Sequence, residues 1–260
     1  MQPTDSTMPF VEILGSRVHL LSIQEIVDKI REWIEQKSGK CHQIVVTGFH
    51  GLWEAHKKPE LKKIFNSASL WIPDGIAPVW IARHYGLKAE RTPGADVMNA
   101  FLSLANEKKY KSFFYGDTDD TLHKLKEALA KKYPNHIVVG TYSPPFRPLS
   151  QQEDQQIMDM IAAADPDVLW VGLGTPKQDR WIYEHLPKLK VPVAIAVGAA
   201  FQFLAGKVKR APSWVGSMGL EWLWRLALEP KKLWRRDIID GPMFIFSVLK
   251  EIFSQKKAKS

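Results

Sequence analysis

The regular alternation of short β-rich runs with helical patterns, from about Phe10 to Gly206, constrains the fold more than any other feature of the chain. This order is typical of an α/β domain with a Rossmann-like, largely parallel sheet and flanking helices. We expect a strand pair within 10–21, strands over 43–47, 69–72, 111–115, 136–141, 168–172 and 191–197, and helices over 22–36, 51–66, 77–85, 95–108, 120–132 and 151–164.

The chain after Gly206 has a different composition. From Ala205 onward, 12 Lys and Arg stand against 5 Asp and Glu, so this segment carries +7 of the net charge of +8. It also holds four of the ten tryptophans, and its apolar positions 245, 248, 249, 252 and 253 follow helical spacing. We therefore predict an α/β core over 1–205 and a basic, Trp-rich, helical C-terminal appendage over 206–260. Tryptophan among basic residues suits a lipid headgroup surface, and it also suits nucleic acid.

The cysteine content and the apolar runs indicate the cellular compartment in which the protein is expected. Cys41 is the single cysteine, so no internal disulfide can form. No leader-like segment opens the chain, and the longest apolar stretch falls short of the roughly 20 residues that span a bilayer. We expect a cytoplasmic protein without a signal peptide.

Two turns join a strand to a helix through glycine, where backbone N–H groups can bind an anion. One is Gly116-Asp117-Thr118, and the other runs from Gly172 through Gly174 to Lys177 and Gln178. The second adds a lysine suited to phosphate and a glutamine that can pair with a base or a sugar. Neither completes the dinucleotide or P-loop pattern, so a turn needed only for packing is the alternative.

Asp74 and Arg91 are candidates for catalysis and for diphosphate binding. Asp74 stands between Pro73 and Gly75 directly after a strand, where a carboxylate can act as a general base or merely cap the next helix. Arg91 can clamp a diphosphate or pair with a neighbouring acid. The histidines form no metal-ligand pattern, and we predict neither a metal nor a cofactor.

Five motifs in register resemble the WecG/TagA/CpsF family of bacterial glycosyltransferases. The resemblance runs from about 11 to 236, and the motifs occupy 73–75, 90–96, 166–179, 209–212 and 219–226. The chain departs from the family pattern at Phe49, where relatives have asparagine, and at Gln202, where they often have aspartate.

The resemblance implies an inverting transfer of a hexose or N-acetylhexosamine from a UDP-sugar onto a polyprenyl-diphosphate-linked sugar, in cell-surface polysaccharide or teichoic acid synthesis. It makes Asp74 the matching base, and it implies that the appendage over 206–260 closes the nucleotide site and associates with the membrane. The residues it implies for substrate binding are Thr47 beside the sugar, Gln178 at the uracil or ribose, and Arg91, Gly172, Gly174, Lys177, Arg210 and Arg225 as donors to the diphosphate.

The partners expected on this basis are the UDP-sugar donor, the lipid-linked acceptor and the anionic cytoplasmic face of the plasma membrane, with the protein bound peripherally. A homo-oligomer is compatible with this interpretation, and nucleic acid is not an expected partner. The alternative is a nucleotide- or nucleic-acid-binding module with a basic tail. A nicotinamide-dependent oxidoreductase is disfavoured because the glycine fingerprint is missing.

Overall fold

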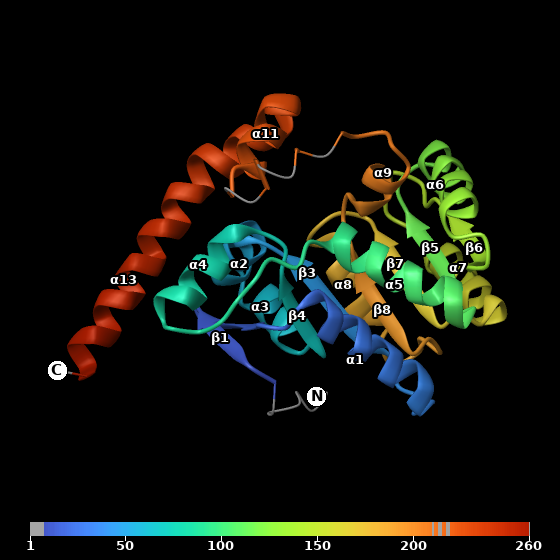
Figure 1. Cartoon of the computed structure of the whole chain (residues 1–260), viewed down its shortest axis with the longest axis horizontal. Coiled ribbons are helices and arrows are strands. Elements are labelled where there is room, and N and C mark those ends of the chain that lie inside the picture. Colours follow the sequence, from blue (N-terminus) through green and yellow to red (C-terminus); the bar gives the residue numbers. More distant parts are fainter. Residues whose placement is uncertain (1–7, 210, 213–214, 217–218, 260) are drawn as a thin grey trace.

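A six-stranded parallel sheet forms the centre of the molecule (Figure 1). The computed structural model describes residues 8–209, 211–212, 215–216 and 219–259. Its strand order is β4-β3-β8-β7-β5-β6. The expectation of a Rossmann-like α/β fold is confirmed.

The strands are β1 (Phe10–Ile13), β2 (Ser16–His19), β3 (His42–Thr47), β4 (Leu70–Pro73), β5 (Lys111–Gly116), β6 (Ile137–Tyr142), β7 (Val168–Gly172) and β8 (Val193–Ala196). The helices are α1 (Ile23–Gln36), α2 (Phe49–Lys57), α3 (Pro59–Asn66), α4 (Ile76–His84), α5 (Gly94–Lys108), α6 (Asp119–Lys132), α7 (Gln151–Ala164), α8 (Lys177–His185) and α9 (Ala200–Leu204). After them come α11 (Glu221–Leu228), α12 (Pro230–Trp234), the π-helix η1 (Arg235–Asp240) and α13 (Gly241–Lys259).

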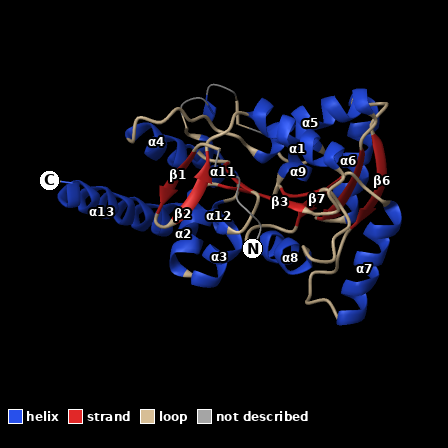
Figure 2. Ribbon diagram, turned by 90° about the horizontal axis from the view of Figure 1, so that it is seen from below, coloured by secondary structure: helices blue, strands red, loops and turns tan. Residues whose placement is uncertain are grey.

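Helices cover both faces of the sheet, which is why the inner strands read as continuous apolar runs rather than alternating ones. Figure 2 shows α1, α5, α6 and α9 on one side and α3, α7 and α8 on the other. Trp170 packs in the first layer and Leu169 in the second, because successive side chains of a strand point to opposite faces. The antiparallel β1–β2 hairpin lies beside β4.

Local sequence signals explain most element boundaries. Ser22 and Ser150 each cap their helix in a complete capping box with the acid three residues later. One prediction was wrong: 51–66 is not a single helix. It divides into α2 and α3 because Pro59, which cannot continue a helix, takes the first position of α3.

The C-terminal appendage over 206–260 is called the tail below, and its described part beyond residue 219 is helical. Its helix α13 lies against the hairpin and α2 through Phe244, Val248 and Ile252, which are buried in one core cluster with them. Glu251 accepts a hydrogen bond from the backbone N–H of Leu14 in the hairpin turn, at 2.9 Å. Among the described residues, we find no helix with the length and apolar character to cross a bilayer.

Candidate functional site

The ends of the neighbouring strands β3 and β4 bring Thr47 and Asp74 together. Thr47 pairs with Pro73 in the parallel ladder, and the Asp74 N–H donates to the Thr47 carbonyl oxygen at 3.3 Å. The following glycines touch, because a Cβ added to Gly48 would lie 3.3 Å from the backbone nitrogen of Gly75. Carboxyl ends of parallel strands are where ligands bind in such sheets, so this edge is the place to look for a site.

The carboxylate of Asp74 is held by the first turn of α5. Its Oδ1 accepts the Gly94 N–H at 3.2 Å. Burial raises the pKa of Asp74, and the nearby negative charge of Glu221 acts in the same direction. The Gly94 hydrogen bond and the positive charges of Arg91 and Arg225 oppose the rise without cancelling it. Asp74 is therefore a stronger base than an ordinary surface aspartate.

Arg91 connects the Asp74 loop to the tail. Its Nε donates to the carbonyl oxygen of Asp74 at 3.3 Å and its Nη1 to that of Gly216 at 2.9 Å. Its Nη2 forms an ion pair with Glu221, at 2.5 Å, with both side chains about four-fifths buried. A guanidinium group has five N–H donors, so these three bonds leave two that can face a ligand.

Helix α11 contributes two buried donors without a partner among the residues that the structure describes. These are the indole Nε1 of Trp224 and the guanidinium Nε of Arg225. The Arg225 guanidinium lies over the Phe203 ring, 5.9 Å from its centroid, and approaches Glu229 at 3.5 Å. Buried donors are nearly always paired in folded proteins, so the unpaired Nε of Arg225, whose charge acts on Asp74 together with that of Arg91, indicates a place for an anionic ligand.

The turn after β7 is fixed from within by Gln178. The buried side chain of Gln178 accepts two N–H groups on its Oε1, from Gly174 at 3.0 Å and from Gly198 at 3.1 Å. It thereby joins the turn after β7 to the turn after β8. Because this carbonyl oxygen is already used, the geometry supports Gln178 as the residue that shapes the turn. It gives no support to a direct contact of Gln178 with the uracil of the donor.

The other predicted residues of this turn differ in exposure. Gly172 is closely packed, since a Cβ there would lie 2.8 Å from the Phe201 ring. Gly174 has a φ of +80° with open space where a side chain would lie. Lys177 is exposed at the start of α8. Arg210 lies outside the described residues.

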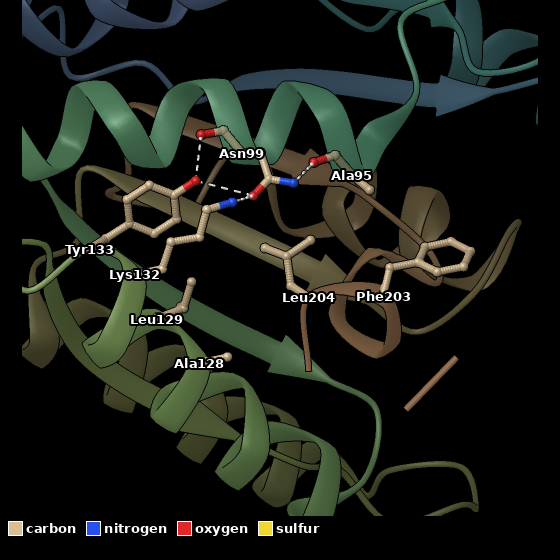
Figure 3. A pocket seen from close by; sticks show the side chains of 8 residues that line it. All are labelled: Ala95, Asn99, Ala128, Leu129, Lys132, Tyr133, Phe203 and Leu204. Atoms are coloured by element: carbon tan, nitrogen blue, oxygen red, sulfur yellow. Dashed lines mark hydrogen bonds between the residues drawn. The ribbon is translucent and has the colours of Figure 1, made fainter. Parts of the chain in front are cut away.

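A cavity of about 200 Å³ lies between α5, α6 and α9 (Figure 3). Its polar groups bond to one another: Asn99 Oδ1 accepts from Lys132 Nζ at 3.0 Å and from Tyr133 Oη at 3.1 Å. Phe203 and Leu204 form part of its apolar wall. The donors that line it are thus already engaged, unlike those of α11.

Among the residues that the structure describes, one cluster offers atoms suited to a metal ion. Ligand atoms of His50, Glu54 and Asp240 lie within 4.8 Å of one another, between α2 and η1. Lys57 Nζ is 2.6 Å from Glu54 Oε1 and 3.4 Å from Asp240 Oδ1, and Lys58 Nζ is 2.7 Å from Glu54 Oε2. These ammonium groups already neutralise the charge of both carboxylates, so the arrangement fits a polar contact between α2 and η1 better than a metal site.

The structure brings four of the predicted residues together: Thr47, Asp74, Arg91 and Arg225. Sequence reasoning missed Glu221, although it stands in the same motif as Arg225. Its partner Arg91 lies 130 positions earlier, and no local spacing reports such a pair. The available signal was an acid in the first turn of a helix whose last turn carries Arg225.

The family model and the individual relatives that this chain resembles agree with one another. The model of the glycosyl transferase WecG/TagA/CpsF family matches residues 11–258. The chain is 32% identical over 227 residues to a Bacillus subtilis (strain 168) protein, N-acetylglucosaminyldiphosphoundecaprenol N-acetyl-beta-D-mannosaminyltransferase, covering 87% of this chain and 85% of that one. A Staphylococcus aureus (strain NCTC 8325 / PS 47) protein of the same name is 28% identical over 250 residues, with 96% of each chain covered.

Proposed function

The chain belongs to the WecG/TagA/CpsF family of glycosyltransferases, and we propose that it transfers an N-acetylhexosamine from a UDP-sugar onto a polyprenyl-diphosphate-linked sugar. The names of the relatives describe transfer of N-acetylmannosamine to a lipid-linked N-acetylglucosaminyl diphosphate. We take these as the donor sugar and the acceptor to test first. The nucleic-acid-binding alternative is not favoured, because the family consists of glycosyltransferases.

The observation that carries the proposal is the position of Asp74. Its carboxylate lies at the carboxyl end of β4, next to Thr47, with two arginines close enough to affect its pKa. In the proposed reaction, Asp74 takes the proton of an acceptor hydroxyl while that oxygen bonds to the anomeric carbon of the donor. The bond from that carbon to the diphosphate oxygen breaks, and UDP leaves with the bonding electron pair. Attack from the side opposite UDP inverts the anomeric configuration.

The departing UDP gains negative charge, and donors fixed in advance stabilise such charge at low reorganisation cost. Arg225, whose Nε is buried and unpaired among the described residues, and the two remaining donors of Arg91 are suited to the diphosphate. We include the turn from Gly172 to Lys177, which Gln178 shapes, as the second wall of the donor site. Arg210 stays a prediction within this proposal.

We further propose that the tail meets the anionic cytoplasmic leaflet, where the acceptor lipid resides. Large apolar side chains on η1 and α13 are exposed: Ile238, Ile239, Met243, Ile245, Phe246, Leu249 and Phe253. The exposed basic residues Lys231 and Arg235 lie on the adjoining turns. Apolar insertion beside positive charge favours peripheral binding to acidic lipid.

The direct test combines the purified chain with a UDP-sugar and a water-soluble, short-chain N-acetylglucosaminyl diphospholipid. We expect UDP release and a disaccharide product that need both substrates, with UDP-N-acetylmannosamine preferred over UDP-N-acetylglucosamine and UDP-glucose. Loss of product without acceptor is the control for simple hydrolysis. Absence of product with all three donors, together with RNA or DNA binding at physiological salt, would favour the alternative.

A further inference from the structure

The tail reaches the Asp74 loop through three neighbouring contacts. Gly216 accepts from Arg91, and Glu221 forms the ion pair with the same guanidinium group. Gly219, at a φ of +75°, lies so close to Ile76 that an added Cβ would be 3.0 Å from its side chain. Ile76 begins α4, two residues after Asp74.

Arg91 transmits the effect of Glu221 to the base. The same planar group that pairs with Glu221 through Nη2 donates through Nε to the main-chain oxygen of Asp74. Of the three groups that accept hydrogen bonds from Arg91, two are backbone carbonyl oxygens and one is the charged carboxylate of Glu221. Charge-assisted hydrogen bonds are about twice as strong as neutral ones. The direction of the guanidinium plane, and with it the position of the Asp74 loop, therefore depends on Glu221.

We propose that Glu221 is a positioning residue for sugar transfer: its carboxylate orients Arg91 against the Asp74 loop. This inference rests on the proposed role of Asp74 as the base.

A second effect follows from charge. The groups that act electrostatically on Asp74 are Glu221 and Arg225 from α11 and Arg91 from the loop before α5. Burial raises the pKa of Asp74 most, and Glu221 adds to that rise; neutralising Glu221 removes its part while the two arginines continue to lower the pKa. The pKa of Asp74 must then fall, and the acidic limb of kcat, which reports the base in the enzyme–substrate complex, must move to lower pH.

The test is Glu221→Gln, assayed for kcat against pH with the soluble acceptor. We expect kcat at the plateau to fall by about tenfold to a hundredfold, the cost of a small misplacement of a reacting group, and the acidic limb to shift to lower pH. Glu221→Asp keeps the charge on a side chain one methylene shorter. It should recover part of kcat, with the acidic limb close to that of the wild type.

The matched control is Glu251→Gln, which removes an acid that docks another part of the tail, the α13 contact with Leu14. We expect it to change neither the acidic limb nor the plateau of kcat. Equal losses in Glu251→Gln and Glu221→Gln, or an unchanged limb and plateau in Glu221→Gln, would overturn the proposal. Full activity of Asp74→Asn would instead overturn the proposed base, whatever Glu221→Gln does.

Discussion

The side chain of Asp179 is a buried carboxyl group, and burial disfavours its ionised form. It stands in the first turn of α8, fully buried, and neither side-chain oxygen has a partner among the described residues other than its own backbone N–H. Burial raises the pKa of Asp179 to about 8. Between pH 4 and 8 the folded protein therefore holds a proton that the unfolded chain has released, so stability falls as pH rises through this range.

Asp179→Asn should remove this pH dependence, because asparagine has nearly the same shape and does not ionise. A single group contributes a slope of at most about 1.4 kcal/mol per pH unit. We expect the free energy of unfolding in urea, measured from pH 5 to 8, to fall more steeply for the wild type, with the variant relatively more stable toward pH 8. Parallel curves would show that Asp179 ionises in the folded state much as it does in the unfolded chain.

Residue patterns predicted where Asp74 lies in the sheet better than which groups Gln178 contacts. The position of Asp74 directly after a strand was sufficient to predict it at the ligand-binding edge. Gln178 looked equally suited to a ligand, yet its Oε1 binds two backbone N–H groups. Sequence gives the capacity of an amide to hydrogen-bond, and only the tertiary structure decides which groups use that capacity.

Helix α13 shows the same limit for a whole element. Helical spacing correctly predicted the helix and grouped 245, 248, 249, 252 and 253 as one apolar face. In the structure this face divides: Val248 and Ile252 are buried, whereas Ile245, Leu249 and Phe253 are exposed. A periodic pattern cannot separate two adjacent apolar stripes, because both follow the same helical repeat.

The exposed stripe of α13 is the element on which membrane binding can be tested. Phe246 and Phe253 are 71% and 62% exposed, so serine in their place should leave the fold intact. Burying a large apolar side chain is worth about 1.5–3 kcal/mol. The double variant Phe246→Ser/Phe253→Ser should therefore lose at least about tenfold in affinity for acidic vesicles in a flotation assay.

The control for that experiment is Phe146→Ser, the same chemical change at a 91% exposed position between β6 and α7. It should float with acidic vesicles like the wild type, and higher salt should weaken binding of both. Equal flotation of the double variant and the wild type would mean that α13 does not enter the lipid.

At the scale of the whole molecule, sheet order decides which distant residues meet. The ends of β3 and β4 place Thr47 beside Asp74, and the turn after β7 lies two strands from β3 because β8 lies between them. The alternation of strands and helices was enough to predict this type of sheet. The family resemblance predicted that the tail closes the nucleotide site, but the ion pair between Glu221 and Arg91 was not predictable, because a single long-range pair leaves no periodic trace in the sequence.

The most direct test of the central claim, that Asp74 is the base of a sugar transfer, compares Asp74→Asn with the wild type. Burial raises the pKa of Asp74, so exchange of its carboxylate for an amide should cost no stability at pH 7. The control is Asp120→Asn, an exposed acid in the first turn of α6, which should keep wild-type turnover.

The measurement is kcat for disaccharide formation, with the Kd for UDP determined on the same preparations. A general base supplies about 10²–10⁴ in rate, so Asp74→Asn should lose at least about a hundredfold in kcat with an unchanged melting temperature and nearly unchanged UDP affinity. Turnover of Asp74→Asn within about threefold of the wild type, far above what loss of such a base allows, would contradict the account.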